Sequence, residues 1–187
     1  MLVVSEARPP AIEPDDKNWT WVLDRPCPEC GFVAGEHPRD SLGEALRELA
    51  GRYDALLADP RVGLRPSPQV WSALEYGCHV RDVYRLYLHR LEQMLAEDDP
   101  TFANWDQDET AVAERYDLQD PTAVRRQLAD ASTAIADRFD EVTADQWTRT
   151  GTRSDGARFT IETFGVYFLH DPVHHLYDVE QGYAALS

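Results

Sequence analysis

Two histidines four residues apart, His170 and His174, are the first residues in this chain whose spacing could do chemistry. If the stretch is helical, residues four apart lie on one face, one turn above the other. Two imidazoles placed in this way can bind a single metal ion. The spacing therefore predicts a metal site on a helix near the end of the sequence.

A third histidine, His79, lies far upstream in a segment with a helical pattern, on the apolar side of that helix. Three imidazoles without a fourth protein ligand leave an open position for water or substrate, as catalytic zinc sites do. We therefore predict that His79 joins His170 and His174 around one divalent ion. His175 points about 100° away from His174 around the helix, and we interpret it as a neighbour or a solvent-facing residue.

Two aspartates could orient these imidazoles. Asp82 follows His79 by three residues, and Asp178 follows His174 by four. Either carboxylate could accept a hydrogen bond from a ring N–H and so fix the tautomer. The alternative interpretation, of equal weight, is that both are ordinary exposed helix charges. His37 and His89 have no partners in the sequence pattern, and we predict no role for them.

The cysteines Cys27, Cys30 and Cys78 leave several interpretations open. Cys27 and Cys30 resemble half of a zinc knuckle, but a structural zinc ion needs four ligands, for which Cys78 and His37 are candidates. The pair could instead be a redox dithiol, although the strand-and-helix pattern of such a site is missing. It could also be a turn with two incidental thiols. A further hypothesis is that this segment folds over the metal site and lends it a thiol.

Helical periodicity organises the rest of the sequence into four amphipathic segments. We predict helices that start at Ser41, within a Ser41–Glu44 capping box, at Ser67-Pro68, at Asp120-Pro121 and near Ile161. The segment 98–119 is predicted as a loop. Asp155-Gly156 between Thr-rich runs indicates a β-hairpin before the last helix. Pro172 either kinks that helix or ends it at the preceding residue.

These elements predict an all-α fold, an up-down four-helix bundle over residues 41–187 with an irregular arm over residues 1–40. The formal net charge of −16 argues against nucleic-acid or anionic-membrane partners. No segment is long and apolar enough for a membrane span, and no signal peptide is evident. With an odd number of cysteines, these features favour a cytoplasmic protein.

The segments Trp71–Val83 and His170–His175 resemble the DinB-like family of metal-binding four-helix bundles. This family includes the N-terminal domain of mycothiol-dependent maleylpyruvate isomerases and the bacillithiol transferases. The resemblance covers about residues 41–183 and implies a divalent metal, zinc or nickel, held by residues matching His79, His170 and His174. It also implies a homodimer. The chain lacks the additional C-terminal domain of the maleylpyruvate isomerases, which weakens the expectation of that reaction.

The ligand set and the resemblance together predict a metal-dependent transferase. Its cosubstrate would be a low-molecular-weight thiol, activated as a thiolate, and its second substrate a small-molecule electrophile. The rival enzyme prediction is a hydrolase that uses metal-bound water, with Glu75, one turn before His79, as the catalytic general base. The non-enzymatic alternative is a metal-binding, stress-response bundle without turnover.

Overall fold

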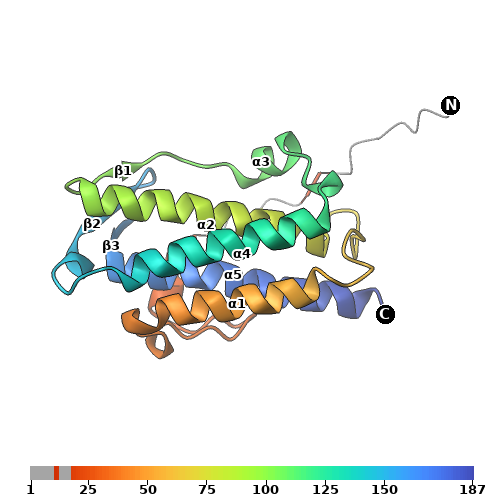
Figure 1. Cartoon of the computed structure of the whole chain (residues 1–187), viewed down its shortest axis with the longest axis horizontal. Coiled ribbons are helices and arrows are strands. Elements are labelled where there is room, and N and C mark those ends of the chain that lie inside the picture. Colours follow the sequence, from red (N-terminus) through yellow and green to blue (C-terminus); the bar gives the residue numbers. More distant parts are fainter. Residues whose placement is uncertain (1–10, 13–17) are drawn as a thin grey trace.

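The computed structural model describes residues 11–12 and 18–187, and over this part of the chain four long helices pack side by side (Figure 1). They are α1 (Leu42–Leu56), α2 (Ala73–Ala96), α4 (Pro121–Asp140) and α5 (Ile161–Ala185). The predicted four-helix bundle is confirmed. Each helix buries the apolar stripe that its sequence pattern predicts, and together these stripes form one continuous core.

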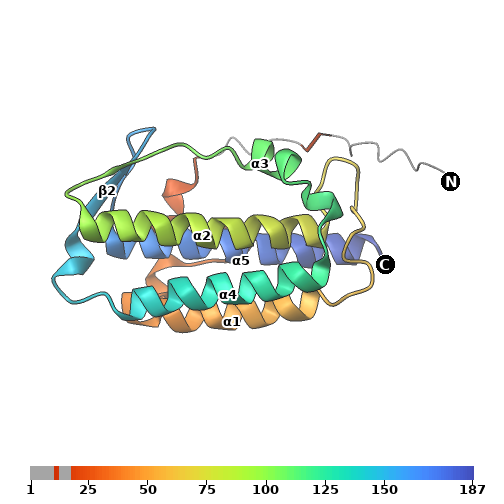
Figure 2. The same ribbon diagram turned by 45° about the horizontal axis from the view of Figure 1, so that its top comes forward.

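The order of the helices differs from a simple up-down alternation. Helix α1 packs against α4 and α5, and α2 packs against the same two helices on the opposite side. Ion pairs Arg47–Asp140 and Arg125–Asp54 join opposite ends of α1 and α4, so these two helices are antiparallel. Helices α2 and α4 run in one direction and α1 and α5 in the other (Figure 2).

The parallel course of α2 and α4 follows from their connection. Residues 97–120 travel back along the length of the bundle before α4 begins (Figure 1). We predicted a loop here, but the segment contains strand β1 (Thr101–Phe102), helix α3 (Gln107–Ala113) and a 3₁₀ turn (Tyr116–Leu118). Asp106 caps α3 by accepting hydrogen bonds from two backbone N–H groups of its first turn.

The predicted hairpin forms strands β2 (Thr150–Arg153) and β3 (Arg158–Thr160) before α5. Its turn contains Gly156 at φ +91°, a backbone conformation that a glycine adopts without steric cost. Strand β1 adds to the other edge of β2 in parallel, making a three-stranded sheet in the order β1-β2-β3. The third strand comes from the long connection, where a two-residue strand leaves no periodic pattern to recognise.

One predicted helix start was wrong, and at α1, which begins at Leu42 after the N-cap Ser41 as predicted, the expected capping box does not form. Helix α2 begins at Ala73, and its capping box is formed by Ser72 and Glu75 rather than by residues near Ser67-Pro68. At the start of α1 the Ser41 hydroxyl donates to the carbonyl of Pro38 and makes no cap hydrogen bond, so the predicted capping box is absent. At Ser67-Pro68 a polar residue in the preceding turn imitates the pattern of a helix start.

Helix α5 continues through Pro172 to Ala185. The hydroxyl of Tyr53, fully buried on α1, donates a 2.8 Å hydrogen bond to the Pro172 carbonyl and supports the helix at this point. His170 and His174 therefore lie on one helix, on either side of the proline, as their spacing predicted.

The N-terminal segment lies against α5. Three short 3₁₀ helices, Trp19–Leu23, Ala34–Glu36 and Arg39–Ser41, lead into α1, and all three contact α5. Residues 1–10 and 13–17 of the predicted arm lie outside the described residues. Over the part of the chain that the structure describes, no helix combines the length and apolar character needed to cross a membrane.

Candidate metal centres

The structure divides the three predicted histidine ligands between two groups of potential ligands. His79 from α2 lies with Asp171 and His175 from α5, a set we call the histidine–aspartate group. His170 and His174 lie instead with Cys27 and Cys30, the cysteine–histidine group. Within each group the potential ligand atoms lie within 4.8 Å of one another.

The two groups share one helix because neighbouring residues of α5 point in different directions. The sequence His170-Asp-Pro-Val-His174-His175 contains two pairs with a spacing of four, offset by one residue. An offset of one residue turns the side-chain direction by about 100°. The second pair, Asp171 and His175, was missed because only the histidine pair was considered. A carboxylate is an equally ordinary zinc ligand.

The histidine–aspartate group has unpaired polar atoms at its centre. His79 is fully buried, and neither of its ring nitrogens has a hydrogen-bond partner; the same holds for Oδ1 of Asp171. His79 Nε2 lies 3.6 Å from Asp171 Oδ1, and His175 Nε2 lies 3.8 Å from Asp171 Oδ2. Buried polar atoms normally have partners, so unpaired atoms facing one another fit a bound cation between them.

The charge states of this group also suit a metal ion. Burial lowers the pKa of His79, which keeps the imidazole neutral. Burial raises the pKa of Asp171, but His175 and His79 outweigh that effect and lower it to about 2. Metal ligands must be neutral imidazoles and ionised carboxylates. Both residues are thus in the form that binds a cation.

Surrounding side chains hold the imidazoles of this group in place. Trp71 and Trp105 pack on the His79 ring, with centroid distances of 5.3 and 5.6 Å. His175 Nδ1 lies 3.0 Å from a carboxylate oxygen of Asp178. Because an ionised carboxylate only accepts, Nδ1 must donate, which leaves Nε2 of a neutral ring to bind a metal. The orienting role considered for Asp178 therefore applies to His175.

Asp82 and Glu75, the other acidic residues considered near His79, have different partners. Asp82 pairs with Arg81 and accepts a 2.6 Å hydrogen bond from the Tyr116 hydroxyl. Glu75 is 3% exposed, completes the α2 capping box with Ser72 and forms an ion pair with Arg65. Its carboxylate is thus engaged at the helix start.

The cysteine–histidine group joins the N-terminal segment to α5. Cys27 Sγ lies 3.6 Å from His174 Nδ1. The cysteines sit in a tight turn, in which Gly31 N donates to Cys27 O and Cys27 N donates to Phe32 O, with Gly31 at φ +76°. This turn brings Cys30 round to the same side as Cys27. The hypothesis that the arm brings thiols to the histidines agrees with this geometry.

The structure bears on two of the other interpretations of the cysteines. Burial raises the pKa of Cys30 to about 12, which disfavours a reactive thiolate at that residue. Cys78 is fully buried on α2, 4.0 Å from the Tyr116 carbonyl, and His37 stacks on Phe32. Neither Cys78 nor His37 belongs to the group; the histidines of α5 complete it.

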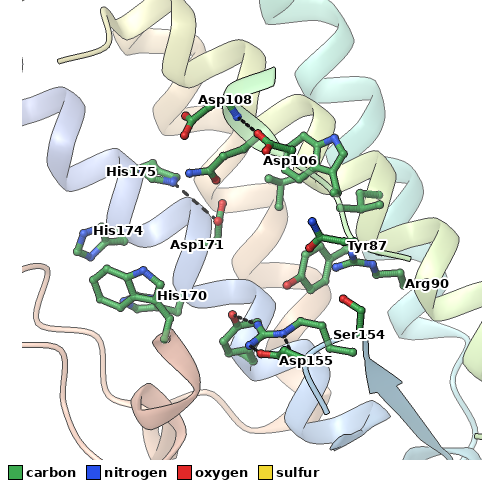
Figure 3. Close-up of a pocket in the computed structure, with 18 residues that line it drawn as sticks. Tyr87, Arg90, Asp106, Asp108, Ser154, Asp155, His170, Asp171, His174 and His175 are labelled. Atoms are coloured by element: carbon green, nitrogen blue, oxygen red, sulfur yellow. Dashed lines mark hydrogen bonds and ion pairs between the residues drawn. The ribbon is translucent and has the colours of Figure 1, made fainter. Parts of the chain in front are cut away.

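A cavity of about 460 Å³ opens beside the histidine–aspartate group, between α2, α5, the 97–120 connection and the hairpin. Asp171 and His175 lie on one side of it, and Arg90 and Tyr87 lie across from them (Figure 3). The cavity is large enough for a small organic substrate in addition to a metal ion.

Comparison with known proteins agrees with this fold. A search of curated proteins finds no match. A solved structure with a similar fold is YfiT from Bacillus subtilis, described as a probable metal-dependent hydrolase with an unusual four-helix bundle topology. The two align with a TM-score of 0.68 over 78% of this chain and 87% of that one, at 16% identity, a likeness that shows the fold alone. The sequence model of the DinB superfamily matches residues 42–179. This match spans all four long helices, and the chain belongs to the DinB superfamily.

Proposed function

We propose that this protein is a metal-dependent transferase that joins a low-molecular-weight thiol to an electrophile bound in the cavity. The divalent ion would be held by the histidine–aspartate group. The observation that carries the proposal is the set of buried, unpaired atoms on His79 and Asp171, which face one another at the edge of a cavity of substrate size.

A divalent ion in this position would lower the pKa of a coordinated thiol, so that the nucleophilic thiolate is present at neutral pH. The protein holds the metal-binding side chains in position. Trp71 and Trp105 fix the ring of His79, and Asp178 fixes the tautomer of His175. Asp171 adds a negative charge that attracts the cation. Two imidazoles and one carboxylate leave room for an exogenous ligand, as catalytic sites require.

The engagement of Glu75 favours a thiol over water as the nucleophile. The hydrolase prediction needs a free general base near the metal, and Glu75 is held by Ser72 and Arg65. A coordinated thiol has a pKa low enough to need no separate base. The cavity volume of about 460 Å³ is also much larger than the volume that one water molecule occupies.

The cavity wall indicates the charge of the substrate. Arg90 is 7% exposed and donates to the Ala103 carbonyl, but it forms no ion pair with any residue that the structure describes. Neighbouring Arg153 is already paired with Asp155. A buried cation without a counter-ion favours an anionic ligand. We therefore propose that the thiol or the electrophile carries a carboxylate, which Arg90 binds.

The hydrolase remains the second candidate, because the structurally similar YfiT is described as a probable metal-dependent hydrolase. The deciding experiment incubates zinc- or nickel-loaded protein with a panel of cellular thiols and a carboxylated alkylating agent, and in parallel with carboxylated esters and amides. Adduct formation supports the transferase. Hydrolysis without any thiol dependence would replace it with the second candidate.

The matched variants are Asp171→Ala in the histidine–aspartate group and His89→Ala, an exposed histidine on α2. We expect Asp171→Ala to lose adduct formation and His89→Ala to keep it. Equal thiol turnover in both variants would show that the reaction does not use this group. Metal-loaded protein that consumes neither thiol nor ester would refute both enzymatic functions.

A further inference from the structure

The cysteine–histidine group has the composition of a closed zinc site. Its four potential ligand atoms, two sulfurs and two imidazole nitrogens, lie within 4.8 Å of one another. Four protein ligands of this kind fill the tetrahedral coordination of zinc and leave no position for substrate. The histidine–aspartate group has only three ligands, so an ion there would keep a position open for a ligand in the cavity, which residues of both groups line. The two groups therefore suit different tasks.

Three of the four residues of the cysteine–histidine group are buried, and Cys30 is partly buried. Cys27 is 1% exposed and His170 is 4% exposed. Nε2 of His170 is buried without a hydrogen-bond partner, so this imidazole has an unused nitrogen. The Trp19 ring packs on both histidines, with centroid distances of 5.1 Å to His170 and 4.8 Å to His174.

His174 also has the outer contact that zinc-binding histidines commonly make. Its Nδ1 faces Cys27 Sγ at 3.6 Å, while Nε2 on the other side lies 3.4 Å from a carboxylate oxygen of Glu29. A carboxylate on the far nitrogen fixes the tautomer and makes the ring a better ligand. Because Glu29 lies between the two cysteines in sequence, the same turn supplies both the ligands and this support.

We propose that the cysteine–histidine group binds a structural zinc ion that fastens the N-terminal segment to α5. Binding removes the protons of the two thiols to solvent, and each sulfur then donates an electron pair to zinc. No atom changes its oxidation state, and the two thiolates balance the two positive charges of the ion. This site is separate from the histidine–aspartate group and does not depend on the proposed enzymatic function.

The first test is the zinc content of purified, zinc-reconstituted protein. We expect about two ions per chain in the wild type, one for each group, and about one in the Cys27→Ser/Cys30→Ser variant. The matched control is Cys78→Ala, which removes a buried cysteine outside the group and should keep both ions. Loss of a single ion in His79→Ala, with the cysteine site retained, would show that the two groups bind separate ions.

The second test identifies the ligands and does not depend on a folded cysteine variant. Cobalt substituted into the wild-type protein should show the sulfur-to-cobalt charge-transfer bands and the strong visible bands of tetrahedral thiolate coordination. In a parallel measurement, zinc should slow the alkylation of Cys27 and Cys30 by at least about ten-fold. Removing the zinc with a chelator should restore the faster rate. The extent of alkylation of Cys78, measured by peptide mapping of the same samples, is the internal reference.

Two results would overturn the proposal. One is zinc content in Cys27→Ser/Cys30→Ser equal to that of Cys78→Ala. The other is alkylation of Cys27 and Cys30 at the same rate with and without zinc, together with cobalt spectra that lack thiolate bands. The second result does not require any variant to fold, so the proposal stays falsifiable if removing the cysteines unfolds the chain.

Discussion

At the scale of single residues, an offset of one position decides the chemistry of α5. His170 and His174 lie against Trp19 of the N-terminal segment, whereas Asp171 and His175 lie toward His79 of α2, and all four side chains line the cavity. The sequence predicts that this motif binds metal, because its spacing and residue types are sufficient for that. The prediction that His79, His170 and His174 share one ion differs from the structure, which places His79 in one group and the other two histidines in another. This grouping depends on the rotation of α5 against its neighbours and on how the arm folds, neither of which follows from the motif.

The offset gives a prediction with matched variants on one helix. His175→Ala should lose the metal of the histidine–aspartate group and the proposed thiol transfer, and keep the thiolate bands of the cobalt-substituted protein. His170→Ala should weaken those bands and leave metal in the cavity site. Metal content and cobalt spectra, recorded on both variants, check this division. The same spectral loss in both would mean that the two histidines serve one site.

A second prediction concerns Arg90. Arg90→Met should raise KM for a carboxylated substrate by about 10- to 100-fold, because a hydrogen bond to a charged group contributes about 1.5–3 kcal/mol. The KM for an uncharged analogue should stay the same. Steady-state kinetics with the two substrates and urea unfolding measure this. Equal changes for both substrates, or a large loss of stability, would indicate a structural role for the guanidinium.

At the scale of elements, the sequence predicts the helices better than their arrangement. The apolar stripes and the Asp155-Gly156 turn locate the four helices and the hairpin to within a few residues, apart from the start of α2. A stripe shows that a helix buries one face, but not which helix covers it. The diagonal placement of α1 and α2, and the parallel run of α2 and α4, depend on the course of residues 97–120.

Glycines of α5 provide a test of that packing. A Cβ at Gly165 would lie 2.5 Å from Leu42 Cδ1 and 3.0 Å from Phe139, where α1 and α4 meet α5. Gly165→Ala should therefore destabilise the protein by about 1–3 kcal/mol. At Gly182 the nearest atom is 3.5 Å away, so Gly182→Ala should be neutral or stabilise by up to about 1 kcal/mol.

Urea unfolding of the two alanine variants checks this prediction, since both change the same helix by the same methyl group. A destabilised Gly182→Ala beside an unaffected Gly165→Ala would contradict the packing of α5 against α1 and α4.

At the scale of the whole molecule, the N-terminal segment covers one side of a bundle that is otherwise complete. Val22, Cys27 and Phe32 are its fully buried apolar residues, and Trp19, Trp21, Leu23 and Ala34 pack against the core while remaining partly exposed. The proposed zinc ion would add a further attachment through Cys27 and Cys30. The segment also brings Trp19 to the wall of the cavity, so its docking and the shape of the cavity are connected.

Limited proteolysis tests this attachment. A glutamate-specific protease can cut at Glu29 and Glu36, both exposed in the segment. Chelation should speed these cuts by at least about ten-fold, because the segment opens more often without the ion, while fragments of α1–α5 persist. His79→Ala with zinc added should resist cleavage like the wild type. Rates that do not respond to chelation would show that packing alone holds the segment.

Asp178 has one more consequence. One of its carboxylate oxygens lies 3.0 Å from His175 Nδ1, and the other lies 3.9 Å from His174 Nε2, so a single anion faces imidazoles from both groups. Binding of a metal ion to one group changes how its imidazole interacts with the Asp178 carboxylate, which both groups share. By thermodynamic linkage, if zinc in one group changes the zinc affinity of the other group by some factor, zinc in the second group changes the affinity of the first by the same factor. Filling the two groups with zinc in either order must therefore give the same total free energy of binding.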